Sequence, residues 1–98
     1  MQFVITAYDG KDMQEKRMRV RPRHLENMKG QSGSVLCAGG ILDDEGRPIG
    51  SLLVMEAADR AQVDRYLADE PYVQEGVWQD IRVAPMNVVI LNGETAGA

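Results

Sequence analysis

Short apolar stretches alternate with charged ones along the chain, and their periodicity predicts both strands and helices. Residues 3–8 (Phe-Val-Ile-Thr-Ala-Tyr) are rich in strand formers and end at the turn signal Asp9-Gly10. Residues 12–29 are charged and contain few β-branched side chains, which is typical of a helix. Because Pro22 is disfavoured inside a helix, we expect a break within this stretch.

The break at Pro22 predicts two segments. The first is a short turn or helix that reaches about Arg19. The second is a helix over residues 21–29, with the proline in its first turn and Gly30 at its end.

The middle of the chain has the pattern of a β-hairpin. Two apolar stretches, residues 34–42 and 49–56, flank the polar loop 43–48. Gly39-Gly40 interrupts the first stretch and suggests a bulge or a close approach of two backbones.

A second helix and a final extended stretch follow. Asp59 is placed to cap a helix over residues 60–68, whose buried face would carry Val63 and Leu67 and which Pro71 would stop. Residues 77–91 are predicted to be extended, with an interruption near Pro85. The small polar tail, residues 92–98, is expected to be mobile.

The resulting order, β-α-β-β-α-β, predicts a ferredoxin-like α+β fold in a single domain, residues 1–98. In this fold a four-stranded antiparallel sheet carries both helices on one face. The strands have apolar residues on both alternations: Val4 against Phe3 and Ile5, for example. Because the second sheet face would otherwise remain exposed, we expect a homodimer that packs sheet against sheet.

Composition excludes several classes of protein. The net charge of −4 argues against general binding of nucleic acid. No apolar run approaches the roughly 20 residues of a membrane span, and the N-terminus has no features of a signal peptide. The single cysteine, Cys37, cannot form an internal disulfide, so we expect a reducing compartment, the cytoplasm.

The charge is distributed unevenly. Residues 1–29 carry seven basic and four acidic side chains, whereas the remaining residues carry four and eleven. One interpretation is a solvated helix face. The other is a positive local field that attracts a small anion, such as a carboxylate.

The only histidine, His24, is the first candidate for chemistry. Val20 and Met28 lie four residues to either side and would share its helix face, so we expect His24 to point inward. Histidine exchanges protons near neutral pH, and a neighbouring carboxylate would orient it for acid–base chemistry. Alternatively, the ring bonds a backbone carbonyl in the core.

Four further residues are candidates for substrate binding, each with a structural alternative. Arg21 lies one helical turn before His24, where it could hold a carboxylate or remain on the surface. Ser51, Tyr8 and Tyr72 could line the same pocket or only pack. No metal-ligand spacing, phosphate loop or nucleotide fingerprint is present, so we expect no metal and no cofactor.

Several short motifs, in order, resemble the YciI-like (YCII-related) family. They are Arg21-Pro22-Arg23-His24-Leu25, Ala38-Gly39-Gly40, Gly46, Gly50-Ser51, Glu70-Pro71-Tyr72-Val73, Gly76-Val77 and Pro85. The resemblance extends over roughly residues 2–91. It implies a ferredoxin-like fold assembled as a dimer, similar to the muconolactone-isomerase and dimeric α+β barrel group.

The resemblance also implies a His–Asp dyad, in which His24 matches the family histidine. The family aspartate precedes the Pro-Tyr pair, and that position here is Glu70. We therefore favour Glu70 as the partner and retain Asp69, one residue earlier, as the alternative. Asp69-Glu70-Pro71 could also be an ordinary solvated helix end.

Better-understood relatives in this group are lyases or dehydrochlorinases. The resulting hypothesis is a small acid–base enzyme of the lyase, isomerase or dehydrochlorinase type, acting on a small anionic organic compound. The alternative is a non-catalytic module that binds a small ligand or regulates, because ferredoxin-like domains serve both purposes.

Overall fold

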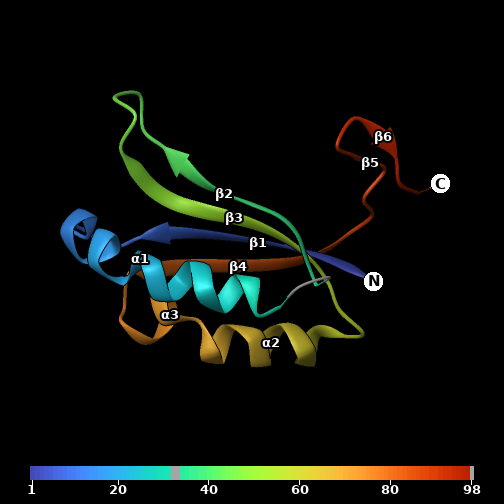
Figure 1. Ribbon diagram of the computed structural model, residues 1–98, viewed down its shortest axis with the longest axis horizontal. Coiled ribbons are helices and arrows are strands. Elements are labelled where there is room, and N and C mark those ends of the chain that lie inside the picture. The colour runs from blue at the N-terminus through green and yellow to red at the C-terminus, as the bar shows by residue number, and fades with distance from the viewer. Residues whose placement is uncertain (32–33, 98) are drawn as a thin grey trace.

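The computed structural model describes residues 1–31 and 34–97 and contains the predicted order of strands and helices (Figure 1). The elements are β1 (Gln2–Asp9), α1 (Gln14–Lys29), β2 (Val35–Leu42), β3 (Pro48–Glu56), α2 (Arg60–Asp69), α3 (Pro71–Gln74), β4 (Trp78–Met86), β5 (Ile90–Leu91) and β6 (Glu94–Thr95). The first four long strands form an antiparallel sheet in the order β2-β3-β1-β4. The helices cover one face of this sheet, which confirms the predicted ferredoxin-like fold.

The core lies between the sheet and the helices. Phe3, Ile5 and Ala7 alternate along β1 and are all buried, whereas the residues between them are more exposed. Ile5 lies opposite Leu53 on β3 and Val83 on β4, so the three strands direct these side chains to the same face. This register places the helices over one face, and no helix of the described residues covers the other face.

Helix α1 continues through Pro22, so the predicted break is wrong. Proline has no N–H, which removes the bond that residue 22 would donate to the carbonyl of Met18. Both residues lie on the exposed side of the helix, where water can hydrogen-bond that carbonyl. The inward face still presents Val20 and His24, and its burial stabilises the helix despite the missing bond.

The glycine pair in β2 causes neither the bulge nor the close backbone approach that the sequence suggested. The pairing with β3 is regular at Gly39 and Gly40, and its irregularities lie instead at Val35/Cys37 and Ile41/Leu42. The close backbone approach occurs at Gly50 of β3, where an added Cβ would lie 2.5 Å from the carbonyl oxygen of Ala7. Gly50 is therefore the position at which packing in the sheet requires glycine.

Helix α2 follows the prediction closely. The side chain of Asp59 accepts a hydrogen bond from the Gln62 N–H and caps the helix. Val63 is fully buried as predicted, and Leu67 is partly buried. Tyr66 is the larger inward side chain and was not predicted.

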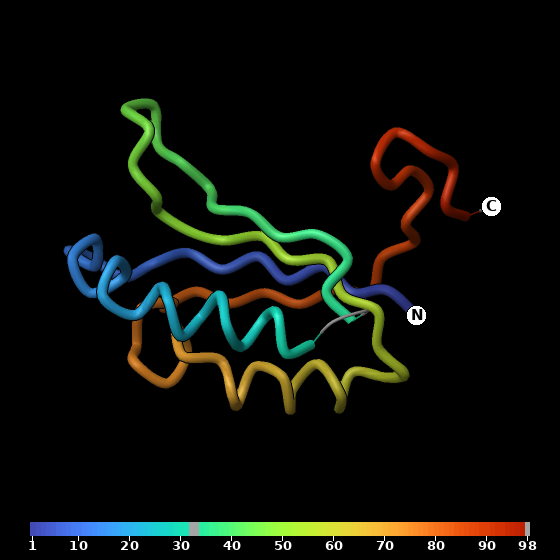
Figure 2. The backbone as a smooth tube through the Cα atoms, in the orientation of Figure 1, coloured from blue at the N-terminus to red at the C-terminus, as the bar shows by residue number. Residues whose placement is uncertain are grey.

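The C-terminal residues form an additional hairpin. β5 and β6 pair around Asn92 and Gly93, which both have positive φ, as tight turns require. The sequence predicted only a mobile tail there. Figure 2 shows that the chain leaves the sheet after β4 and that this hairpin projects beyond it. Among the described residues, no helix is long and apolar enough to span a membrane.

Candidate active site

The turn between α2 and α3 places Glu70 in the interior. Glu70 has an extended backbone (φ −75°, ψ 120°), and Pro71 begins α3 immediately after it. The Glu70 carboxylate accepts a hydrogen bond from the Tyr72 N–H at 3.1 Å, which caps α3. The cap turns the side chain back toward α1, and Glu70 is fully buried.

His24 is the principal partner of Glu70. Its Nδ1 lies 2.6 Å from Glu70 Oε1, and His24 is only 5% exposed. An ionised carboxylate only accepts hydrogen bonds, so Nδ1 carries the proton in this contact. The lone pair then lies on Nε2, which has no hydrogen-bond partner among the described residues. The pair thus has the arrangement of an oriented general base.

Tyr66 holds the second oxygen of Glu70. Its hydroxyl donates to Glu70 Oε2 at 2.8 Å from the preceding turn of α2. Burial, followed by the adjacent Glu70 charge, raises the pKa of Tyr66 above its usual range, so the hydroxyl stays protonated and donates. With the Tyr72 N–H and His24, Tyr66 completes a set of three donors around one buried carboxylate.

Aromatic side chains hold the plane of the imidazole ring. His24 stacks on Tyr72, with ring centroids 4.0 Å apart and an interplanar angle of 16°. Trp78 meets His24 edge-on, with centroids 5.7 Å apart. These contacts, together with the Glu70 bond, leave His24 little rotational freedom.

A buried ion pair lies on the other side of Tyr72. Arg17 Nη1 donates to both carboxylate oxygens of Asp9, at 2.7 and 2.8 Å. Arg17 Nη2 donates to the Gly50 carbonyl and to Ser51 Oγ, at 3.0 and 2.8 Å. The guanidinium also lies 4.8 Å from the centre of the Tyr72 ring. Both terminal nitrogens of Arg17 therefore already donate hydrogen bonds to protein acceptors.

Burial and charge act in opposite directions on Asp9. Burial raises the pKa of this carboxyl, whereas the charge and hydrogen bond of Arg17 lower it, and the net effect is a raised pKa. The carboxyl therefore depends on Arg17 to remain ionised in the interior.

A groove of about 150 Å³ brings most of the candidate residues together. It runs between α1 and the edge strand β2. Its lining residues are Arg17, Arg21, His24, Leu25, Met28, Ala38, Gly39, Gly40, Ser51, Leu53 and Tyr72. Three of the four residues predicted to bind substrate are thus present: Arg21, Ser51 and Tyr72. Arg21 is exposed and forms no ion pair within the described part of the chain.

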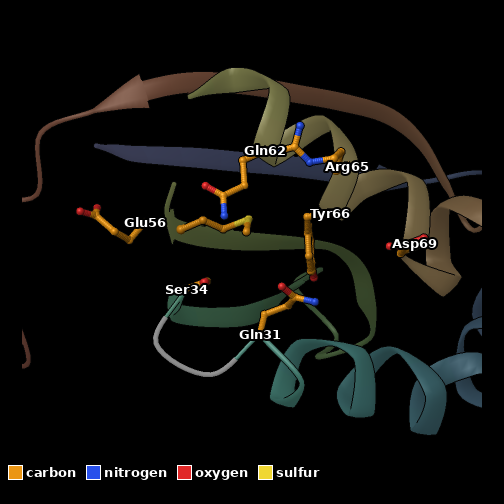
Figure 3. Close-up of a pocket in the computed structure, with 8 residues that line it drawn as sticks. Gln31, Ser34, Glu56, Gln62, Arg65, Tyr66 and Asp69 are labelled. Atoms are coloured by element: carbon orange, nitrogen blue, oxygen red, sulfur yellow. The ribbon is translucent and has the colours of Figure 1, made fainter. Parts of the chain in front are cut away.

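Two candidates lie elsewhere. Tyr8 is 42% exposed and does not line the groove. Asp69 is exposed, and it borders a different cavity of about 280 Å³, lined mainly by polar residues of α2 and of the segments facing it (Figure 3). Tyr66 forms a wall of that cavity while its hydroxyl bonds Glu70. The structure therefore pairs His24 with Glu70 and not with Asp69.

Sequence reasoning missed Asp9, Arg17, Tyr66 and Trp78. Helical spacing could have indicated two of them, because Tyr66 lies four residues before Glu70 and Arg17 lies seven before His24. The Asp9–Arg17 pair gave no local signal. In the part of the chain that the structure describes, no group of three or more His, Cys, Asp or Glu side chains could hold a metal ion.

Two solved structures have a fold similar to that of this chain. A 5-chloro-2-hydroxyhydroquinone dehydrochlorinase from Burkholderia phenoliruptrix, in complex with 2,5-dihydroxybenzoquinone, superposes with a TM-score of 0.82 at 22% identity, covering 89% of this chain and 94% of that one. A putative antibiotic biosynthesis monooxygenase from Bacteriodes thetaiotaomicron superposes with a TM-score of 0.60 at 16% identity, covering 98% and 95%.

Sequence comparison is more specific. The Protein YciI of Escherichia coli O6:H1 and an uncharacterized protein of Haemophilus influenzae are each 32% identical to this chain over 97 residues, covering 91% of this chain and 99% of the relative. The model of the YCII-related domain matches residues 1–87. The chain therefore belongs to the family of YCII-related domain proteins.

Proposed function

We propose that this protein is a small acid–base enzyme of the lyase, isomerase or dehydrochlorinase type, in which His24 moves the proton. The observation that supports this most is the buried 2.6 Å contact between His24 Nδ1 and Glu70 Oε1 at the wall of a ligand-sized groove. Glu70 fixes the tautomer and stabilises the imidazolium that forms, while Nε2 accepts a proton from the substrate.

For an elimination, the chemistry balances without a cofactor. Nε2 of His24 takes a proton from an O–H or C–H group of the substrate, and the electron pair of that bond moves toward the carbon that bears the leaving group and forms a new double bond. The leaving group, for example chloride, departs with its own electron pair from an sp3 carbon, which a chlorinated trihydroxybenzene has in its keto tautomer. His24 then returns the proton to water. The dehydrochlorinase with a similar fold supports this class of reaction as the first to test.

We propose a small anionic substrate, held by Arg21. Arg17 donates to Asp9, Gly50 and Ser51, so its charge is already neutralised. Arg21 lies at the same groove and has no ion-pair partner among the described residues. It is therefore the cation available to a ligand. Ser51 Oγ accepts from Arg17, which leaves its hydroxyl hydrogen available to donate.

The test uses 5-chloro-2-hydroxyhydroquinone as the first substrate and chloride release as the readout. We expect turnover by the wild type and a loss of about 10²–10⁴-fold in kcat/KM for His24→Gln and for Glu70→Gln, because both lose the oriented base. Asp69→Asn is the matched control and should retain wild-type rates.

Arg21→Gln should raise KM more than it lowers kcat. Arg19→Gln should change neither, because Arg19 is exposed and does not line the groove.

If 2,5-dihydroxybenzoquinone binds but no chloride is released, and Glu70→Gln binds it equally well, the non-catalytic ligand-binding module is the better description.

We also propose that two copies pack through the uncovered face of the sheet. Tyr8, Leu52 and Met86 lie on this face and are each about 40% exposed. Sedimentation at micromolar concentration should give twice the chain mass of 10.8 kDa. Leu52→Arg should shift the protein to the monomer, whereas Met18→Arg on the exposed side of α1 should not. A wild-type monomer would refute this assembly.

We place the protein in a reducing compartment such as the cytoplasm. This rests on the exposed Cys37, which has no second cysteine with which to form an internal disulfide.

A further inference from the structure

Neither the backbone conformation nor the packing at position 40 requires glycine. It is absent from the residues with positive φ, so an L side chain meets no conformational barrier there. An added Cβ would have its nearest contacts at 3.8 Å, with Arg17 Nη2 and the Gly50 carbonyl oxygen, which are ordinary van der Waals distances. Glycine is also unfavourable in strand interiors. The fold therefore accepts a larger residue at position 40.

The missing side chain of Gly40 leaves space in the groove. Gly40 lies directly opposite Ser51 in the β2–β3 register, and paired residues project to the same face of a sheet. Ser51 lines the groove together with His24. A side chain at position 40 would therefore extend into the groove and approach the space beside His24.

Gly39 also lines the groove, but a side chain added there would point the other way. It lies opposite Leu52 on the other face of the sheet, where an added Cβ meets nothing within 4 Å. Both glycines are in the same strand, and both accept an added methyl group without a clash. They differ in the face of the sheet to which that methyl group would project.

The volume of the groove indicates the size of the ligand that fits beside Gly40. Its volume of about 150 Å³ equals that of a protein cavity known to hold one benzene ring. Its wall carries the flat stacked rings of His24 and Tyr72, and Arg21 supplies a positive charge. These features together suit a compound with one ring and one anionic group.

We infer that Gly40 determines the size of the ligand admitted beside His24, and that it opens the groove to single-ring anions. This inference rests on the proposed function, because it concerns the same groove. It makes Gly40 a specificity-determining residue that contributes no functional group of its own.

The experiment uses the imidazole ¹⁵N resonances of His24, which are unambiguous because the chain has one histidine. Benzoate and acetate serve as a large and a small anionic probe. In the wild type we expect both to shift the resonances. Gly40→Ala should weaken benzoate binding, and Gly40→Val should weaken it by at least about tenfold, with acetate binding retained. Cys37→Ala and Cys37→Val change an exposed residue of the same strand that does not line the groove, and both variants should bind both probes as the wild type does.

Two further outcomes separate the inference from the proposed function. Both Gly40 variants should melt at or above the wild-type temperature, because neither requires a strained backbone. If Gly40→Val binds benzoate as tightly as the wild type, the inference is overturned while the proposed function stands. If neither probe shifts the His24 resonances of the wild type, the anion-binding groove itself is refuted and the inference fails with it.

Discussion

Replacing Glu70 with alanine is expected to lower the free energy of unfolding by about 3 kcal/mol, because three buried donors lose their acceptor. These are His24 Nδ1, the Tyr66 hydroxyl and the Tyr72 N–H. The change also leaves a void at a fully buried position. Urea denaturation followed by circular dichroism measures the loss, and the indole fluorescence of the adjacent Trp78 provides a second probe.

Asp69→Ala is the natural control, since it removes a carboxylate from the neighbouring residue. Asp69 is exposed and ends α2, so we expect a change within about 0.5 kcal/mol. A small gain would also fit, because an acidic residue is unfavourable at a helix C-terminus. Equal losses for the two variants would contradict the assignment of Glu70 as the buried centre of the site.

Replacing Arg17 with methionine should lower the free energy of unfolding by a similar or larger amount, about 3–5 kcal/mol. The reason is that the change leaves the buried Asp9 carboxylate without its positively charged partner. Asp9 and Arg17 side chains are only 7% and 8% exposed, so water does not replace the lost partner. The double variant Asp9→Asn/Arg17→Met removes both charges and should recover at least half of the loss. If the two single losses simply add, the pair does not act as a unit.

The Arg17→Met variant should also have a distinct pH dependence. Arg17 lowers the pKa of Asp9 while burial raises it, so removal of Arg17 leaves the raising effect unopposed. Asp9 then binds a proton more tightly in the folded than in the unfolded chain. The unfolding free energy of the variant therefore falls as pH rises above the ordinary carboxyl range and recovers in acid. Urea denaturation at about pH 4.5 and pH 7.5 should show this trend, and the double variant should lack it.

The candidate site shows how far helical spacing can guide prediction. Val20, His24 and Met28 share one face of α1 in the sequence pattern, and His24 is indeed inward. The motif before Pro71 pointed to Glu70 or Asp69, and a shift of one residue changes which carboxylate turns inward. The cap that Glu70 forms with the Tyr72 N–H directs its side chain back toward α1. That cap depends on where α2 ends and α3 begins, which propensities locate only to within a few residues.

The errors at Pro22 and at Gly39-Gly40 have a common origin. In both cases a residue type was given its usual local meaning, a helix break or a bulge. Pro22 is tolerated because water can hydrogen-bond the carbonyl that it leaves unpaired, and because the opposite face of α1 is buried. At Gly40 the absent side chain leaves room in a groove that only the tertiary structure forms.

By itself, the sequence determined the order of strands and helices and the inward face of α1, because these follow from periodicities of two and 3.6 residues that local geometry imposes. It also contained the motifs by which the family can be recognised. The tertiary structure alone decided which carboxylate meets His24, that Tyr66 holds that carboxylate, and that Asp9 and Arg17 neutralise each other behind Tyr72. These contacts join residues on different elements, and their formation depends on how α1, α2 and the sheet pack, which no local pattern encodes.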